Sequence, residues 1–265
     1  MAVIALLSDL GEKDYFVGAM KGVILSINPK ATIVDITHEI PRHDIFTAAF
    51  MLVNAAETFP NGTIFVVVVD PGVGTARMDI LLRTNNDFHF IGPDNGVFTL
   101  VAQRFGVKEI RELTNRRLMR ESISATFHGR DVFAPVAAHL SLGVRTSEVG
   151  PVLPNLKKLD LAKAEMAVGE ISGEVVAIDG FGNLLTNIGR NLIETFARLG
   201  DVLKLEISGK NLPAKFVRTF GEVGPGEVIC YVGSAGVLEI AKNLGNLAED
   251  IGAQAHLKIR LKKTG

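Results

Sequence analysis

Polar residues at the ends of apolar runs carry the side chains that could do chemistry. The clearest group follows the apolar run 63–69, which ends in Asp70 and continues through a Pro-Gly-Val-Gly turn to Arg77. A guanidinium can fix the orientation of a carboxylate and keep it ionised. An imidazole facing that pair could polarise or deprotonate a water, and His128 is the candidate imidazole. A surface arginine, a turn aspartate and a solvated histidine would account for the same residues.

Two acids near the N-terminus form a second group. Asp9 closes the first apolar run, and a carboxylate at the end of a strand is placed to accept both hydroxyls of a ribose. Asp14 precedes a helical pattern and is the kind of residue that caps a helix. A pair of neighbouring acids could alternatively hold Mg²⁺ or another hard cation.

The second half of the chain has two glycine-rich turns with polar neighbours. In Asp179-Gly-Phe181-Gly-Asn183, the phenylalanine could stack on a purine and the amide could hydrogen-bond to it, although a hairpin turn explains the pattern equally. The segment from Cys230 to Glu239 is interpreted as a strand, a Gly-Ser-Ala-Gly turn and the start of a helix. Backbone amides at such a turn suit a carboxylate or a phosphate. The motifs of standard ATP or NAD sites are missing from the sequence.

The elements that must position these residues change in type after residue 154. Apolar runs predict strands and helical spacing predicts helices in alternation before that point. The strands are expected at 3–7, 32–36, 63–69, 80–83 and 88–91, and the helices at 15–27, 45–58, 98–105 and 131–142. Later segments are short and β-rich, with strands expected at 174–179, 202–207, 227–232 and 255–261 and helices at 191–198 and 237–244.

This pattern predicts an α/β protein with two domains. We expect an N-terminal α/β/α sandwich with a largely parallel sheet over 1–155 and a smaller C-terminal antiparallel β-barrel over 166–265, joined by a linker at about 156–165. A run such as 63–69 is typical of a parallel strand covered by helices on both faces. Ligands bind beyond the carboxyl ends of such strands, so the site is expected there.

Composition excludes several classes of partner. The 265 residues carry a net charge of −1, with no basic run to attract nucleic acid or an anionic membrane. The N-terminal apolar run is too short for a membrane span and lacks the positive leader of a signal peptide. The single cysteine, Cys230, excludes an intrachain disulfide and a cysteine metal cluster. We expect a cytoplasmic protein with no nucleic-acid and no membrane partner.

Five ordered segments, spread over essentially the whole chain, resemble one family. It is the S-adenosylmethionine (SAM) hydrolases, also called SAM hydroxide adenosyltransferases, which are related to the fluorinases and chlorinases. The segments are Ser8-Asp9-Leu-Gly with Asp14, Val69-Asp70-Pro-Gly-Val-Gly with Arg77, Phe127-His128-Gly-Arg-Asp131, Asp179 through Asn187, and Tyr231-Val-Gly-Ser234-Ala-Gly.

The resemblance implies a site and an assembly. It implies a homotrimer in which SAM lies between the first domain of one subunit and the second domain of its neighbour. Asp70, Arg77 and His128 would bind the attacking water and form the catalytic set. The implied substrate-binding residues are Asp9 for the ribose diol, Asn183 for adenine, Asp14, Asp179 and Ser234 for the methionine end, and Phe181 and Phe220 for apolar walls, with Tyr231 and Glu239 as further candidates.

The resemblance also implies a reaction. Water or hydroxide would attack the ribose C5′ of SAM, giving adenosine and methionine, with no cofactor and no metal. The halogenating relatives carry a tyrosine where this chain has Asp70 and a serine where it has Gly129. A carboxylate repels a halide but can accept a hydrogen bond from water. A metal-dependent phosphoesterase built on Asp9, Asp14, Asp70 and His128, and a non-catalytic sensor of SAM or adenosine, are the alternatives.

Overall fold

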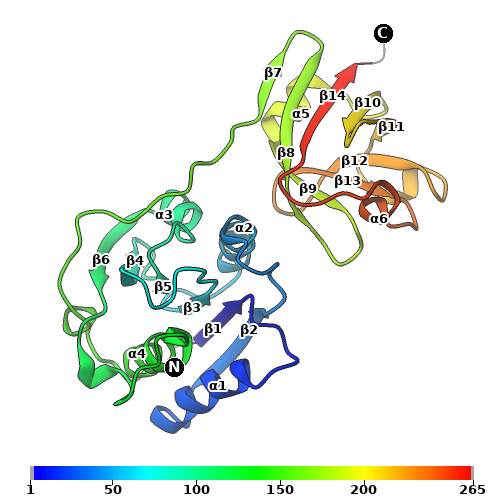
Figure 1. Ribbon diagram of the computed structural model, residues 1–265. Coiled ribbons are helices and arrows are strands. Elements are labelled where there is room, and N and C mark those ends of the chain that lie inside the picture. Colours follow the sequence, from blue (N-terminus) through cyan, green and yellow to red (C-terminus); the bar gives the residue numbers. More distant parts are fainter. Residues whose placement is uncertain (1–2, 264–265) are drawn as a thin grey trace. The chain divides into compact units, whose positions relative to one another are not determined.

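The computed structural model describes residues 3–263 and divides the chain into two compact units. Unit 1 ends at Leu159 and unit 2 begins at Asp160, within the segment 156–165 where we expect a linker (Figure 1). Unit 1 is a mixed α/β fold and unit 2 is a β-barrel, so the predicted fold class is confirmed.

Unit 1 is built on a mainly parallel sheet with the order β2-β1-β3-β5-β4-β6. The strand β1 pairs in parallel with β2 and β3, and β3 pairs in parallel with β5, whereas β4 is antiparallel to β5 and β6. The strands are β1 (Val3–Ser8), β2 (Thr32–Thr37), β3 (Ile64–Val68), β4 (Asp79–Thr84), β5 (His89–Pro93) and β6 (Val107–Glu112).

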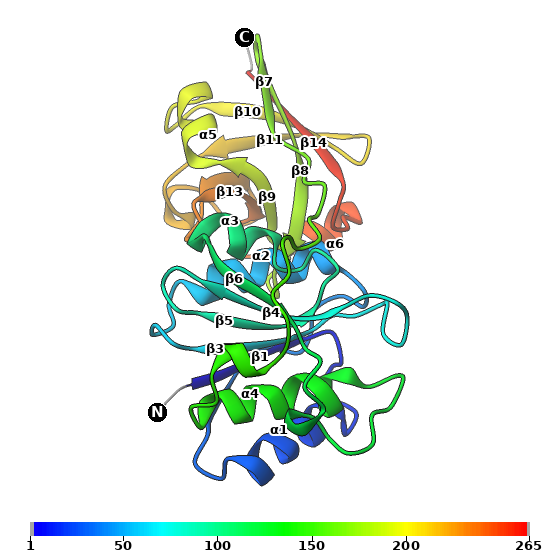
Figure 2. The ribbon, with the colours of Figure 1, turned by 90° about the vertical axis from the view of Figure 1, so that its left-hand side faces the viewer.

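Helices cover both faces of this sheet. Figure 2 shows α1 (Phe16–Ile27) and α4 (Ala134–Ser141) on one face, and α2 (Ile45–Ala56) and α3 (Thr99–Phe105) on the other. A separate apolar cluster fills each interface between helices and sheet. Every residue of β3 is buried, which explains why its sequence is an unbroken β-branched and aromatic run. The sheet thus holds the carboxyl end of β3 firmly in place.

Two helix starts differ from the expectation. The residue at the N-cap of α1 is Tyr15, and no side chain caps this helix, so the prediction that Asp14 caps it is wrong. The helix expected at 131–142 begins instead with a π-helical turn, Gly129–Phe133, that leads into α4. Asp131 lies inside this turn, and its carboxylate pairs with Arg130 at 2.7 Å and accepts from the Ser124 N–H at 2.9 Å.

Unit 2 is a barrel closed by the pairing of β14 with β8. Its neighbouring strands are antiparallel except β11 and β12, which are parallel, so the expected all-antiparallel barrel is corrected at that pair. The first strand, β7, pairs with β8 outside the closed ring. The strands are β7 (Glu165–Ala167), β8 (Glu170–Ile178), β9 (Leu184–Gly189), β10 (Val202–Ile207), β11 (Lys210–Phe216), β12 (Val228–Val232), β13 (Val237–Lys242) and β14 (Lys258–Lys263).

The helix expected at 237–244 is wrong, because this segment is the strand β13. It forms a hairpin with β12 across the turn that contains Ser234, and it also pairs with β9. Short apolar segments fit either a strand or a helix, and here pairing with two neighbours decides. The helices of unit 2 are α5 (Arg190–Phe196) and α6 (Leu247–Ile251). Short 3₁₀ turns complete the described chain at Arg116–Leu118, Thr146–Glu148 and Phe220–Glu222.

Candidate active site

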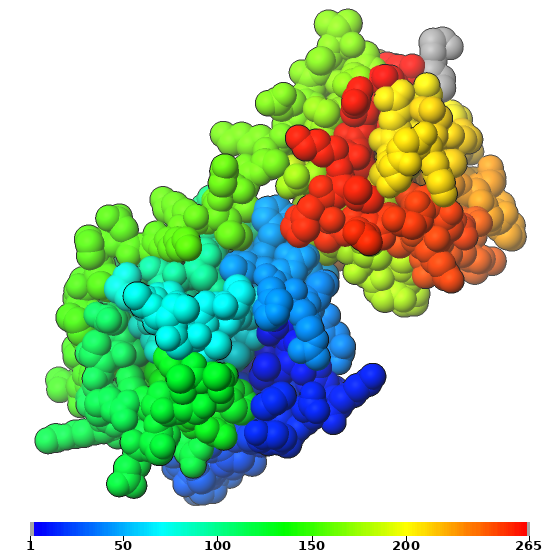
Figure 3. Space-filling view, viewed as in Figure 1, coloured from blue at the N-terminus to red at the C-terminus, as the bar shows by residue number. Residues whose placement is uncertain are grey.

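The carboxyl edge of the parallel strands brings two predicted site residues together. Ser8 at the end of β1 lies opposite Val68 at the end of β3 in the parallel register. Asp9 and Asp70 therefore follow neighbouring strands and emerge at the same edge of the sheet. The turn that begins at Asp70 lies at the surface of unit 1, in cyan in Figure 3. This is the edge at which open α/β sheets bind their ligands.

Asp70 and Arg77 form a two-point ion pair. Arg77 Nε donates to Asp70 Oδ1 at 2.7 Å, and Nη2 donates to Oδ2. The side chain of Asp70 is only 6% exposed and that of Arg77 only 9%. Burial alone would lower the pKa of Arg77, but the hydrogen bonds and charges of Asp70 and Asp79 outweigh it and raise that pKa. The guanidinium is thus a permanent positive charge that fixes both oxygens of Asp70.

His128 lies beside this ion pair, as expected, and a further acid joins them. His128 Nδ1 lies 3.3 Å from Arg77 Nη2 and 2.9 Å from Asp79 Oδ2. Arg77 Nη1 donates to Asp79 Oδ1. Asp79 was missed in the sequence. The sequence feature that could have indicated Asp79 is the spacing Arg77-Met-Asp79, because residues two apart in an extended chain project to the same side.

An aromatic ring forms the apolar wall of this cluster. Phe133, fully buried in the π-helical turn, lies with its ring centroid 5.7 Å from the guanidinium carbon of Arg77 and 6.4 Å from the ring of His128. Such a wall excludes water and strengthens the electrostatic interactions beside it. The cluster therefore combines fixed charges with a partly dry environment.

Asp9 is positioned by the loop that follows β2. Its Oδ2 accepts the backbone N–H of His43 at 2.8 Å, and its side chain is 10% exposed. The buried His38 also holds this loop, which the sequence analysis did not anticipate. Its Nδ1 lies 2.7 Å from Ser8 Oγ, and its Nε2 lies 3.1 Å from Asp35 Oδ1. Asp14, in contrast, is exposed, and no interaction brings it to Asp9 or Asp70.

The predicted loop of unit 2 is organised by Asp179. Its Oδ1 accepts the backbone N–H groups of Phe181 and Asn183, both at 2.9 Å, and its Oδ2 accepts from Asn183 Nδ2 at 2.8 Å. One hydrogen of the Asn183 amide nitrogen is therefore used by Asp179, whereas its second hydrogen and the amide oxygen make no hydrogen bond to a described residue and can serve a ligand. Phe181 is 79% exposed, which is unusual for a phenylalanine and suits a stacking surface.

A second group in unit 2 surrounds Glu239. Tyr231 donates its hydroxyl to Glu239 Oε2 at 2.6 Å, and its ring lies 5.2 Å from that of Phe220. Burial raises the pKa of Glu239, and the charge of Asp179 adds to this, although the Tyr231 hydrogen bond opposes it. Burial and the Glu239 hydrogen bond also raise the pKa of Tyr231. Ser234 lies exposed on the turn between β12 and β13.

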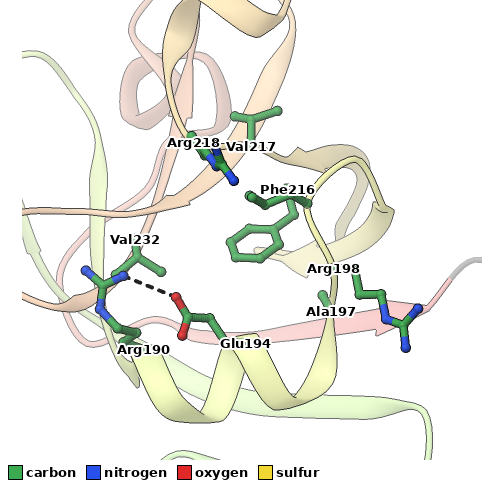
Figure 4. Close-up of a pocket in the computed structure, with 9 residues that line it drawn as sticks. Arg190, Glu194, Ala197, Arg198, Phe216, Val217, Arg218 and Val232 are labelled. Carbon is green, nitrogen blue, oxygen red and sulfur yellow. Dashed lines mark hydrogen bonds and ion pairs between the residues drawn. The ribbon is translucent and has the colours of Figure 1, made fainter.

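A separate pocket of about 570 Å³ lies in unit 2, on the side formed by α5 and the end of β11. Figure 4 shows Phe216 in its floor, Arg218 above it, and Arg190 paired with Glu194 at 3.1 Å on its rim. None of the predicted site residues lines this pocket. The candidate chemistry of the chain is therefore not located in this pocket.

Three further features of the described residues concern metal-binding clusters, membrane-spanning helices and the single cysteine. Within residues 3–263, no group of three or more histidine, cysteine, aspartate or glutamate side chains is arranged to hold a metal ion. In the same part of the chain, no helix has the length and apolar character needed to cross a membrane. Cys230 is fully buried, and burial raises the pKa of its thiol to about 12, so it is no nucleophile at neutral pH.

The geometry of unit 1 defines a class of site. A carboxylate clamped by a guanidinium, with an imidazole beside them at the end of a parallel strand, is an arrangement that can orient and deprotonate a water. The chain belongs to the SAM hydroxide adenosyltransferase family. The N-terminal domain model of that family matches residues 4–150, and the C-terminal domain model matches residues 173–260.

Individual relatives agree with this assignment. The chain is 37% identical to the (R)-S-adenosyl-L-methionine hydrolase of Thermus thermophilus, over 98% of this chain and all of that protein. It is 32% identical to the fluorinase of an Actinoplanes species, over 98% of this chain and 97% of that one. A crystal structure of an uncharacterized conserved protein from Thermotoga maritima superposes with a TM-score of 0.94 at 41% identity, covering 98% of this chain and all of the other.

Proposed function

We propose that this chain hydrolyses SAM to adenosine and methionine, by attack of water or hydroxide on the ribose C5′. The observation that carries the proposal is the cluster of Asp70, Arg77 and His128 at the carboxyl end of β3. Relatives from several organisms at 36–37% identity bear the name of this activity. The leaving group is a neutral thioether, so the protein needs to supply only alignment and an activated water.

Two features favour water over halide as the nucleophile. Asp70 is a carboxylate, which repels an anion and accepts a hydrogen bond from water. Gly129 leaves no room for a serine, because a Cβ there would lie 2.9 Å from Val68 Cγ1 and 3.1 Å from Met20 Sδ. These are the two positions at which the resemblance implies a difference from the fluorinases.

The metal-dependent phosphoesterase is the weaker alternative. Both oxygens of Asp70 accept hydrogen bonds from Arg77. The positive charge of Arg77 would repel a metal cation bound to the same carboxylate. We therefore propose that the reaction needs neither metal nor cofactor.

We further propose how substrate and assembly fit this reaction. Asp9 would bind the ribose diol, Asn183 and the exposed Phe181 the adenine, and Asp14, Asp179 and Ser234 the methionine end. Phe220, Tyr231 and Glu239 would complete the wall. Because these residues are divided between unit 1 and unit 2, we propose a cytoplasmic homotrimer with sites at its subunit interfaces, and no nucleic-acid or membrane partner.

The experiment that tests this function is incubation of chelator-treated protein with SAM, followed by chromatography. Adenosine and methionine in equal amounts support the proposal, with or without added fluoride or chloride. Activity restored only by a divalent cation would support the phosphoesterase class instead. Saturable binding of SAM without products would support the sensor.

A further inference from the structure

We propose that Asp79 is a positioning residue that fixes the tautomer of His128, so that His128 Nε2 receives the proton of the attacking water. This inference rests on the proposed function and names a role that the sequence did not suggest. Asp79 is the first residue of β4, and its side chain is 14% exposed. The backbone carbonyl of Asp79 accepts from Leu113 N–H at 2.8 Å, so the strand holds it rigidly.

Asp79 and Arg77, the two neighbours of His128 Nδ1, require opposite placements of the ring hydrogen. Asp79 Oδ2, at 2.9 Å, can only accept, so it requires a hydrogen on Nδ1. Arg77 Nη2, at 3.3 Å, can only donate, so it would require a lone pair there. Nη2 is already donating to Asp70 Oδ2. The shorter contact and the charge of the carboxylate both favour hydrogen on Nδ1.

With its hydrogen on Nδ1, neutral His128 carries a lone pair on Nε2. No described residue makes a hydrogen bond to Nε2, and the side chain is 18% exposed, so this nitrogen is accessible to water. Asp79 then plays the orienting part that a carboxylate plays behind a catalytic imidazole in other hydrolytic sites.

The charge of the cluster also suits a proton on His128. Asp70 and Asp79 contribute two negative charges and share the single positive charge of Arg77. When water attacks C5′, its oxygen forms the new bond, the C5′–S electron pair leaves on the thioether sulfur, and one water proton passes to Nε2. The resulting imidazolium balances the second carboxylate, so the cluster ends neutral.

An Asp79→Asn substitution distinguishes this role from a purely structural one. Arg77 Nη1 donates to one oxygen of Asp79, so an asparagine must turn its oxygen toward Arg77. Its NH₂ group then faces His128 Nδ1 and donates to it. The variant keeps the shape of the side chain. Because the nearer of the two contacts to Nδ1, 2.9 Å against 3.2 Å for the oxygen that faces Arg77, becomes a donor, the variant favours the hydrogen of His128 on Nε2, where the lone pair is needed.

The experiment combines NMR and kinetics on the full chain. Nitrogen-15 labelling of histidine reports the tautomer of each ring, and a His128→Asn variant identifies the signals of His128. We expect the Nδ1–H form in the wild type and the Nε2–H form in Asp79→Asn. Because loss of a partner that orients a histidine costs about 10–100-fold in known metal sites, we expect kcat to fall at least about tenfold while KM changes little. Glu57→Gln, which removes an exposed partner of Arg104, is the control of equal charge change.

Each outcome is decisive. The same His128 tautomer in wild type and Asp79→Asn, or a changed tautomer with unchanged kcat, overturns the inference. If Asp79→Asn does not fold, Asp79→Ala carries the test, because Nδ1 then loses its acceptor and the share of the Nε2–H form must rise. A wild type that forms no adenosine overturns the proposed function and the proton route, whereas the NMR comparison still decides whether Asp79 sets the tautomer.

Discussion

Gly74 lies so close to the backbone carbonyl of Ala125 that a Cβ on Gly74 would collide with that oxygen. Gly74 also has a φ of +76°, a conformation that favours glycine. The turn 70–77, which carries Asp70 and Arg77, is thereby packed against the segment that leads into His128. This backbone approach joins parts of the cluster that lie about fifty residues apart in the chain.

Gly74→Ala is therefore expected to disturb the cluster as well as the fold. Steric conflict and an unfavourable φ each cost on the order of 1–3 kcal/mol, so both the melting temperature and the turnover of SAM should fall. The control is Gly22→Ala in α1, where a Cβ meets nothing within 4 Å and alanine favours a helix. A Gly74→Ala protein with wild-type stability and turnover would contradict this account of the turn.

Asp70→Asn is expected to reduce turnover without reducing affinity for SAM. The amide cannot carry the negative charge that orients water and it must present a donor to Arg77, so kcat should fall by at least about 10². Calorimetric titration with SAM should give a Kd close to the wild-type value. Asp87→Asn, which alters an exposed carboxylate paired with Arg83, should leave both quantities unchanged. Unchanged turnover in Asp70→Asn would remove Asp70 from the mechanism.

Gly129→Ser is expected to destabilise the protein without creating a halogenase. The added Cβ would press on Val68 and Met20, and overpacking of this kind costs about 1–3 kcal/mol. Thermal denaturation should show the loss, and incubation with SAM and fluoride or chloride should yield no halogenated adenosine. Gly189→Ser is the matched control, because nothing lies within 4 Å of a Cβ there and serine suits the N-cap of α5. Formation of a 5′-halogenated product would contradict the proposed dependence on Asp70.

Glu239→Gln is expected to raise stability at neutral pH and to weaken binding of the cationic substrate. The pKa of Glu239 is raised above its ordinary value of 4.5, mainly by burial. The stabilising contribution of its protonated form is therefore full below pH 4.5 and is lost as pH rises through the raised pKa. Glutamine removes this loss and still accepts the Tyr231 hydrogen bond.

The measurement is the melting temperature of Glu239→Gln against wild type from pH 4 to pH 8. The variant should be the more stable at pH 8, with the difference shrinking toward pH 4. Glu249→Gln, at an exposed position of unit 2, should show no such trend. A Glu239→Gln protein that is less stable than wild type at pH 8, or that binds SAM more tightly, would contradict this account of Glu239.

Much of the framework could be predicted because it depends on local patterns. The run 63–69 predicts a buried parallel strand, and Asp70 is expected at its end. The strand β13 was misjudged because its apolar residues fit a helix equally well, and pairing with β9, about fifty residues earlier in the chain, is invisible in the local pattern. The alternative that Asp14 caps α1 failed because the helix begins after Tyr15 without a side-chain cap.

In the candidate site, too, some contacts follow from the local sequence and others depend on residues far apart in the chain. Asp70 and Arg77 are close in sequence, so their ion pair follows from a tight turn. The approach of His128 to Arg77 depends on packing of distant segments, and only the family resemblance indicated it. Asp79 was missed because an acid at the start of a strand usually faces solvent. The contact of His38 with Ser8 was missed for the same reason as that of His128, since it joins residues thirty positions apart.

The central claim is tested most directly by turnover of SAM in water enriched in oxygen-18, with chelator-treated protein. The account predicts adenosine that carries the label at its 5′ oxygen, together with unlabelled methionine, because water attacks C5′ and the C5′–S bond breaks. Products that carry no label at the 5′ oxygen, or no products while SAM binds, would contradict displacement at C5′ by water.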